Sequence, residues 1–190
     1  MRGARLYSLE STRAARFPQH GGTMKITAHY DFDGDKKKVI DCLVYKCIGN
    51  VDYFLETMPD LTYCKLLERR DDPDGKIFVK LEMCAHGQIP KAAQKLVRPE
   101  MLTWQEISMW DPAIEQYKFK IKTKYFTNQF HFTGYWGYKE LDNGKTRQFC
   151  DSEVNVKVPL IGPIVEKAIG PALKKNWDEN YIMVKKMFGI

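Results

Sequence analysis

The hydrophobic pattern of this chain changes period three times, and the order of those periods predicts its fold. Residues 25 to 32, KITAHYDF, place apolar side chains at every second position, as expected of a half-buried strand. Residues 35 to 48 then carry apolar side chains three and four positions apart, after an Asp that suits a helix N-terminus. A second short helix is expected after Asn50, and it ends before Pro59 because the residue ahead of a proline leaves helical geometry.

Period two returns after Pro59 and persists for about a hundred residues. Turn-forming residues divide this region into hairpins, at DDPDG (71 to 75) and at LDNGK (141 to 145), where Asn143-Gly144 is a strong hairpin signal. Residues 84 to 100 are expected to be irregular or briefly helical. The pattern therefore predicts six antiparallel strands here, and about seven with the first.

From residue 161 to 188 the apolar side chains recur at helical spacing, which predicts an amphipathic helix about 40 Å long. The apolar face of this helix must pack against another element, and we expect that element to be the sheet. Gly162-Pro163 suits the first turn, whereas Pro171 lacks the N–H that would bond to the Lys167 carbonyl, so we expect a kink or loosened turn there. The expected fold class is α+β.

This order of elements resembles the START-like superfamily, also called helix-grip or SRPBCC proteins. The stretch VNVKVPLIGPIVEKAIGPALKKNWDEN resembles the signature of an uncharacterised bacterial branch, in which a V-x-V-x-VP segment leads into a helix with an early Glu, here Glu166, and a later acidic residue near Asp178 or Glu179. Pro171 departs from that pattern. The element order covers residues 24 to 190, and the motif covers about 155 to 180. The resemblance implies a curved antiparallel sheet wrapped around the long C-terminal helix, with two short helices after strand 1.

The resemblance also implies a function, which is binding of a hydrophobic small molecule, with transport as an extension. A lipid, a sterol or an aromatic metabolite would lie in a cavity between the sheet and the C-terminal helix. Strand parity and helical spacing independently suggest residues that line such a cavity. They are Trp104, Phe119, Ile121, Phe130, Phe132, Trp136, Ile169, Leu173 and Trp177. The alternative is that these side chains simply fill a solid core.

A cyclase- or hydrolase-type enzyme using the same cavity is the alternative function, because some members of this superfamily are enzymes. Strand parity turns His29 and His131 toward solvent, and His86 lies in the irregular stretch. Glu106 shares the parity of Trp104, which would turn its carboxyl inward in a regular strand. An acid or base must reach the bound substrate, so we assign no catalytic residue and favour binding over catalysis.

Four lysines alternate with apolar residues in the segment YKFKIKTK and form a row on one strand face. This row could dock the protein transiently on an anionic membrane, at about 1 kcal/mol per lysine near the surface. The alternative is a solvated outer face that also discourages pairing at a sheet edge. The four residues are Lys118, Lys120, Lys122 and Lys124.

The formal net charge of +6 does not indicate a nucleic-acid partner. Half of it belongs to residues 1 to 23, which hold four Arg and one Glu, so the domain at 24 to 190 is only mildly basic. We expect residues 1 to 23 to form a tail outside the fold, whether a targeting segment, an upstream extension or a cloning remnant.

Cysteine usage and hydropathy indicate the compartment. The five cysteines form no C-x-x-C pair, and an odd number cannot all pair within one chain, so we expect buried thiols in a reducing environment.

The chain has only four histidines, which are few for a Cys/His metal site, and we expect no metal or cofactor. No apolar run approaches the ~20 residues that cross a bilayer. The expected protein is soluble and cytoplasmic, or in an organelle matrix if the tail is a transit peptide; its oligomeric state is not predicted.

Overall fold

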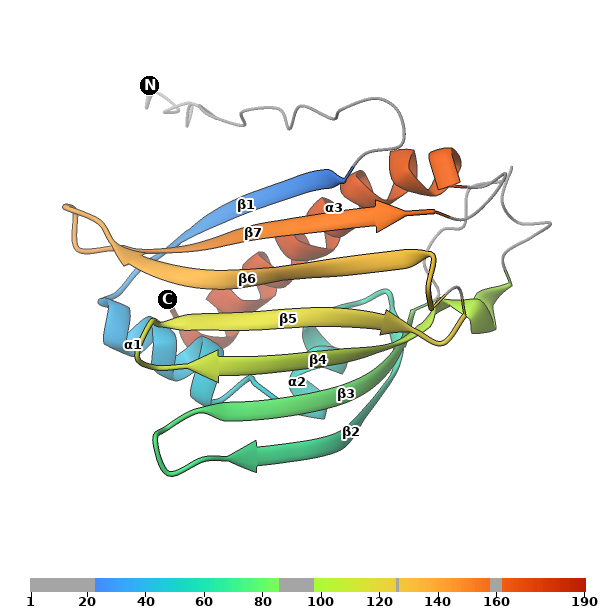
Figure 1. The fold of residues 1–190 in the computed structure, drawn as a ribbon. Coiled ribbons are helices and arrows are strands. Elements are labelled where there is room, and N and C mark those ends of the chain that lie inside the picture. Colours follow the sequence, from blue (N-terminus) through green and yellow to red (C-terminus); the bar gives the residue numbers. More distant parts are fainter. Residues whose placement is uncertain (1–22, 86–97, 126, 158–161) are drawn as a thin grey trace, which may run out of the picture.

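A computed structural model describes residues 23 to 85, 98 to 125, 127 to 157 and 162 to 190. Its elements follow the predicted order (Figure 1): β1 (Met24–Phe32), α1 (Lys36–Ile40), η1 (Asp41–Tyr45), α2 (Val51–Thr57), β2 (Leu61–Asp71), β3 (Ile77–Ala85), η2 (Pro99–Leu102), β4 (Thr103–Asp111), β5 (Gln116–Thr123), β6 (Phe130–Glu140), β7 (Thr146–Val156) and α3 (Gly162–Phe188). The predicted tail, residues 1 to 22, lies outside the described residues, as does most of the stretch expected to be irregular.

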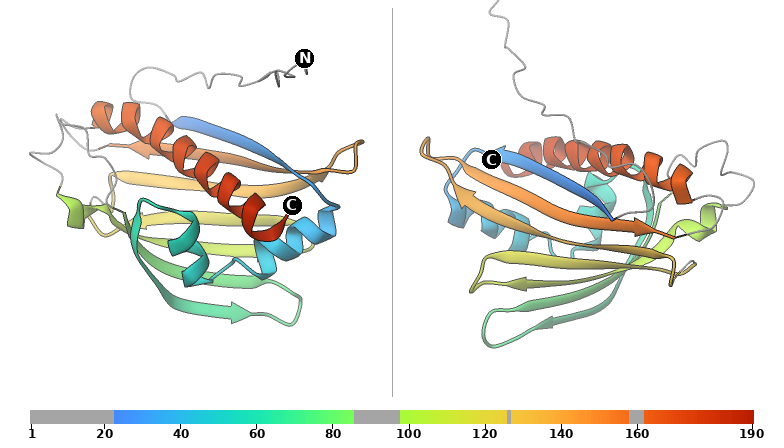
Figure 2. Two further views of the ribbon diagram at one scale, coloured as in Figure 1. Left: turned by 180° about the vertical axis from the view of Figure 1, so that it is seen from behind. Right: turned by 45° about the horizontal axis from the view of Figure 1, so that its top comes forward.

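The seven strands form one antiparallel sheet in the order β1-β7-β6-β5-β4-β3-β2. Consecutive strands from β2 to β7 are neighbours, and β1 pairs with β7 along its whole length, from Met24 opposite Val154 to Phe32 opposite Thr146. The sheet is curved, and α3 runs diagonally across one face with α1 and α2 on the same side (Figure 2). The predicted α+β helix-grip fold is thus confirmed.

Local capping residues begin the two short helices predicted after the first strand. The Asp35 carboxylate accepts a hydrogen bond of 2.8 Å from the Lys38 backbone N–H at the start of α1. The Asn50 side chain accepts one of 3.1 Å from the Tyr53 backbone N–H at the start of α2. Both predicted helices are present, and the first continues into η1, a π-helical turn that the sequence pattern did not predict.

The helix α3 is continuous over 27 residues and passes through Pro171. The predicted loosening at Pro171 therefore does not interrupt the helix. Pro171 is exposed, so water can satisfy a carbonyl that loses its intrahelical partner.

The second half of α3 is fixed to β1 and α2 by hydrogen bonds. The Tyr181 hydroxyl donates to the Asp31 carbonyl at 2.7 Å, and the Tyr30 hydroxyl donates to the Asp178 carboxylate at 2.8 Å. The Asn180 amide donates to the Thr57 hydroxyl of α2 at 2.9 Å. These contacts hold the helix against the sheet through long aromatic side chains, which keep the two layers apart.

Buried apolar residues form two separate clusters on the concave side of the sheet. One gathers under α1, η1, α2 and the end of α3, with Phe32, Leu81 and Val184 among its members. The other gathers under the first half of α3, against β1, β6 and β7. Trp136 and Trp177 border both clusters. The interior is therefore divided between two cores.

The cysteines agree with the predicted role as small buried apolar groups. All five are free thiols, and Cys42, Cys47, Cys64 and Cys150 are buried. Burial raises the pKa of the Cys47 and Cys150 thiols to about 12, so neither is a reactive thiolate near neutral pH.

Candidate functional site

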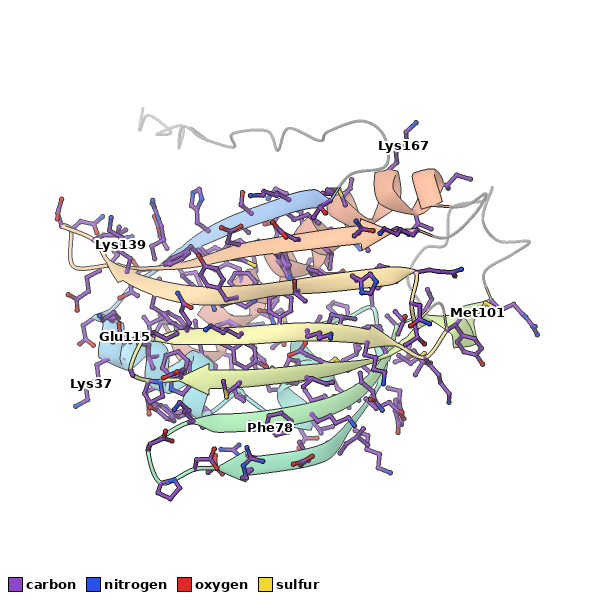
Figure 3. All side chains as sticks on the ribbon, in the orientation of Figure 1. Lys37, Phe78, Met101, Glu115, Lys139 and Lys167 are labelled. Carbon is purple, nitrogen blue, oxygen red and sulfur yellow. The ribbon has the colours of Figure 1, made fainter. Side chains whose placement is uncertain are left out.

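A cavity of about 470 Å³ lies between the concave face of the sheet and α3. This volume is within the range of small-molecule sites. All nine residues that the sequence suggested for ligand binding line it: Trp104, Phe119, Ile121, Phe130, Phe132, Trp136, Ile169, Leu173 and Trp177. The structure thus brings the nine together, and their contact with a ligand stays a prediction. Met101 of η2, at the end of the sheet (Figure 3), also contributes to the lining.

Aromatic rings form most of the cavity wall on the sheet side. The rings of Phe119 and Phe132 meet edge to face with centroids 5.2 Å apart, and Trp136 meets Trp177 of α3 in the same way at 5.2 Å. Gly134 makes room for the first pair, because a Cβ there would lie 2.8 Å from Cζ of Phe119. Such walls offer both faces and edges to a flat ring.

Most polar groups on the wall already have partners within the protein. The hydroxyls of Tyr30 and Tyr181 bond across to α3 and β1 as described above. The Tyr138 hydroxyl accepts a hydrogen bond of 3.3 Å from the Gln148 amide, and Tyr53 accepts one of 3.2 Å from Asn180. These side chains therefore present mainly their apolar parts to the cavity.

Glu106 on β4 differs from these groups in its chemistry, because it brings a carboxyl group into this apolar space. The Tyr117 hydroxyl from the neighbouring strand β5 donates a hydrogen bond of 2.8 Å to Glu106 Oε1. The Ser108 hydroxyl lies 2.6 Å from the same Tyr117 oxygen and, with the Val79 carbonyl as a further acceptor at 3.4 Å, completes a chain of polar groups. Glu106 lies deep in the protein, and part of its side chain faces the cavity.

Burial governs the electrostatics of this polar cluster, which consists of Glu106, Tyr117 and Ser108. Desolvation raises the pKa of the Glu106 carboxyl, and the hydrogen bonds from Tyr117 and Ser108 act in the opposite direction. Desolvation and the nearby carboxyl raise the pKa of Tyr117 well above its usual value. Tyr117 is therefore a neutral donor, and Glu106 is held closer to its neutral form than an exposed glutamate.

The other acid–base candidates are placed as strand parity predicted, or lie outside the described residues. His29 and His131 are exposed, on the face of the sheet away from α3, and His86 lies outside the described residues. The inward direction of Glu106 is confirmed. Sequence reasoning missed two inward-facing polar residues, Ser108, which is buried beside Tyr117, and Thr123, which lines the cavity. Both alternate with outward residues in the same register as Glu106 and Tyr117.

The lysine row lies on the outer face of the sheet. Lys118, Lys120, Lys122 and Lys124 are all exposed, and none forms an ion pair with another residue that the structure describes. Figure 3 views this outer face, which also carries Phe78. Protection of a sheet edge is the wrong interpretation of the row, because β5 is a central strand between β4 and β6.

Among the described helices, none is long and apolar enough to cross a membrane.

Solved structures with the same fold are similar to this chain at low sequence identity. A START superfamily protein from Mycobacterium smegmatis is 16% identical, with 87% of this chain and 99% of that chain covered and a TM-score of 0.56. The Zhui aromatase/cyclase from Streptomyces sp. R1128 is 14% identical, with 88% and 94% covered and a TM-score of 0.59. Norcoclaurine synthase from Thalictrum flavum, in complex with dopamine and hydroxybenzaldehyde, is 16% identical, with 87% and 88% covered and a TM-score of 0.59. These likenesses confirm the START-like fold.

Comparison at the level of sequence identifies the family to which the chain belongs. No curated protein matches the chain. A family model matches residues 44–186, which is about three quarters of the chain and extends from η1 to the last turns of α3. The chain therefore belongs to the family described as "Protein of unknown function (DUF2505)".

Proposed function

We propose that this protein binds a hydrophobic small molecule in the cavity between the sheet and α3. The observation that carries the proposal is the cavity itself, about 470 Å³ in volume and walled largely by aromatic side chains. A close-packed interior has few voids larger than a water molecule, so a space of this size suits a ligand.

The wall favours a ring-containing ligand over a flexible chain. Offset and edge-to-face contacts with flat rings suit side chains such as Phe119, Phe132 and Trp136. Two proteins with similar folds have names that fit this preference, an aromatase/cyclase and a norcoclaurine synthase bound to dopamine and hydroxybenzaldehyde. Among lipids, sterols and aromatic metabolites, the last two classes have the rings that this wall would contact.

A pair of substitutions on α3 tests the proposal, because two alanines of this helix differ in whether they line the cavity. Ala168 lines the cavity, whereas Ala172, one turn later, is exposed. Ala168→Phe should fill part of the cavity and weaken binding of the neutral fluorescent probe N-phenylnaphthylamine about tenfold or more, because a steric clash must be relieved before the probe fits.

Ala172→Phe is the matched control and should bind the probe like the wild type. Fluorescence titration measures the affinities, and thermal melting of each variant shows whether it is folded. Equal affinity in all three proteins would mean that the probe binds somewhere other than this cavity, and absence of binding to the wild type would contradict the proposal.

Acid–base catalysis in the same cavity is a second candidate, favoured by Glu106, which lines the cavity beside Tyr117. A carboxyl with a raised pKa can act as a general acid near neutral pH. Incubation with a metabolite extract of the source cells, followed by mass spectrometry, should show a compound consumed by the wild type and not by Glu106→Gln. Identical extracts after both incubations would contradict catalysis by Glu106.

A further inference from the structure

We infer that the ligand of this cavity carries a basic amine, and that its ammonium group binds the Glu106 carboxylate. This inference rests on the proposed function, since it assigns the chemical class of the ligand in the same cavity. It follows from the charge of the cavity wall, the unused hydrogen-bonding capacity of Glu106 and the rings around it.

The described part of the cavity wall carries an acidic group and no basic group. Among the described residues that line the cavity, Glu106 is the only one with a carboxyl, ammonium, guanidinium or imidazole group. A ligand with a carboxylate or phosphate would find no described cation to pair with and would lie near another acid. A ligand ammonium would instead meet the one group of opposite charge, in a medium where charge pairs are little screened.

Glu106 also has hydrogen-bonding capacity that its protein neighbours do not use. An ionised carboxylate offers about four acceptor sites. The Tyr117 hydroxyl donates a hydrogen bond of 2.8 Å to Oε1, and Ser108 is the only other hydrogen-bond partner of this carboxyl among the described residues. Two donors leave about half of those acceptor sites open. Buried charges in proteins are normally paired, and an ammonium group brings three donors and the opposite charge together.

Aromatic side chains near Glu106 suit both the ammonium group and the hydrophobic body of such a ligand. Trp104 lies two residues before Glu106 on the same face of β4, and Tyr117 reaches across from β5. Aromatic faces attract cations, so an ammonium group approaching Glu106 remains in favourable surroundings. The hydrophobic body of the ligand would extend toward Phe119 and Trp136.

Thr123 gives a second polar contact at a fixed place. Thr123 lines the cavity, and its hydroxyl oxygen is buried with no hydrogen-bond partner among the described residues. Thr123 lies opposite Trp104 in the β4–β5 pair, which puts it diagonally across from Glu106, about 7–8 Å away along the sheet. Once the Thr123 side chain rotates its hydroxyl toward the cavity, a hydroxyl or carbonyl on the ligand at that spacing from the amine would satisfy it.

Three fluorescent probes with one ring system test the inference: anthracenemethylamine, anthracenemethanol and anthracenecarboxylate. The wild-type protein should bind the amine about tenfold or more tightly than the alcohol, as expected for a charge-assisted hydrogen bond in a buried site. It should bind the carboxylate most weakly. In Glu106→Gln the preference for the amine over the alcohol should fall to about twofold or less, because the opposite charge is removed.

Two comparisons make the result specific. Glu82→Gln removes the same charge from the outward face of β3 and should leave the wild-type preference intact. Unchanged alcohol binding by Glu106→Gln shows that the cavity is still formed. If the wild type binds all three probes equally, or if Glu106→Gln keeps the preference for the amine, the inference fails and the proposed function stands. If no probe binds to the wild type, both fail.

Discussion

At the scale of single residues, Glu106 is the feature that a purely structural core does not explain. Its position on the inward face of β4 could hold an apolar side chain like those of its neighbours Trp104 and Trp110. A buried ionisable group costs stability unless it is paired. A carboxyl at this position is therefore more easily understood as a contact for something that enters the cavity.

This cost should be visible in the pH dependence of stability. The pKa of Glu106 is raised in the folded state from its usual value of 4.5, so folding favours the protonated form. As pH rises from 4.5, the usual pKa, toward the higher pKa of the folded state, Glu106 progressively lowers the free energy of unfolding. At still higher pH this loss stays constant. Glu106→Gln has no such titration, so its melting temperature should exceed that of the wild type at neutral pH, by a margin that shrinks toward pH 4.

Melting curves across this pH range, recorded by circular dichroism, measure the margin. Glu82→Gln on the outer face serves as the control for removing a carboxylate from the sheet. A Glu106→Gln variant that is less stable than the wild type at neutral pH would show that the charged carboxyl stabilises the fold.

At the scale of elements, alternation along each strand predicted the cavity wall well. Trp104, Phe119 and Trp136 come from three different strands, and one rule of parity turned all of them toward α3. The rule holds because the pairing of β4, β5 and β6 is regular over these residues.

Parity could not predict which side chains meet across strands. Tyr117 is opposite Trp110, yet its hydroxyl reaches Glu106 and Ser108 farther along β4. That contact depends on the register between strands and on the direction of a long side chain, and neither can be read from one strand.

Strand β5 and Lys124, the residue after it, carry two surfaces with opposite chemistry, the aromatic cavity wall inward and the four lysines outward. We propose that the lysine row docks the protein on anionic membranes. Replacing Lys118, Lys120, Lys122 and Lys124 by Gln should abolish most sedimentation with phosphatidylserine vesicles at low salt, because each lysine contributes about 1 kcal/mol near such a surface.

High salt should weaken wild-type binding to the same vesicles, since exposed charges are screened. Replacing Lys25 and Lys139, which are exposed on other strands, is the control. Equal sedimentation of the wild-type and the four-lysine variant would rule out docking through this row.

At the scale of the whole molecule, the space arises from how the curved sheet and α3 are joined. Aromatic side chains and hydrogen bonds hold the second half of α3 at a distance from β1. One apolar cluster packs under the short helices and the other under the first half of α3. Because the apolar residues pack in these two cores, we expect the protein to fold without a ligand in the cavity.

Native mass spectrometry of the full chain purified from its source cells tests the central claim most directly. We expect a bound small molecule that adds mass under native conditions and leaves on denaturation, and we expect Ala168→Phe to carry less of it than Ala172→Phe. Repeated recovery of wild-type protein at the mass of the chain alone, together with failure to take up any added hydrophobic compound, would contradict the account.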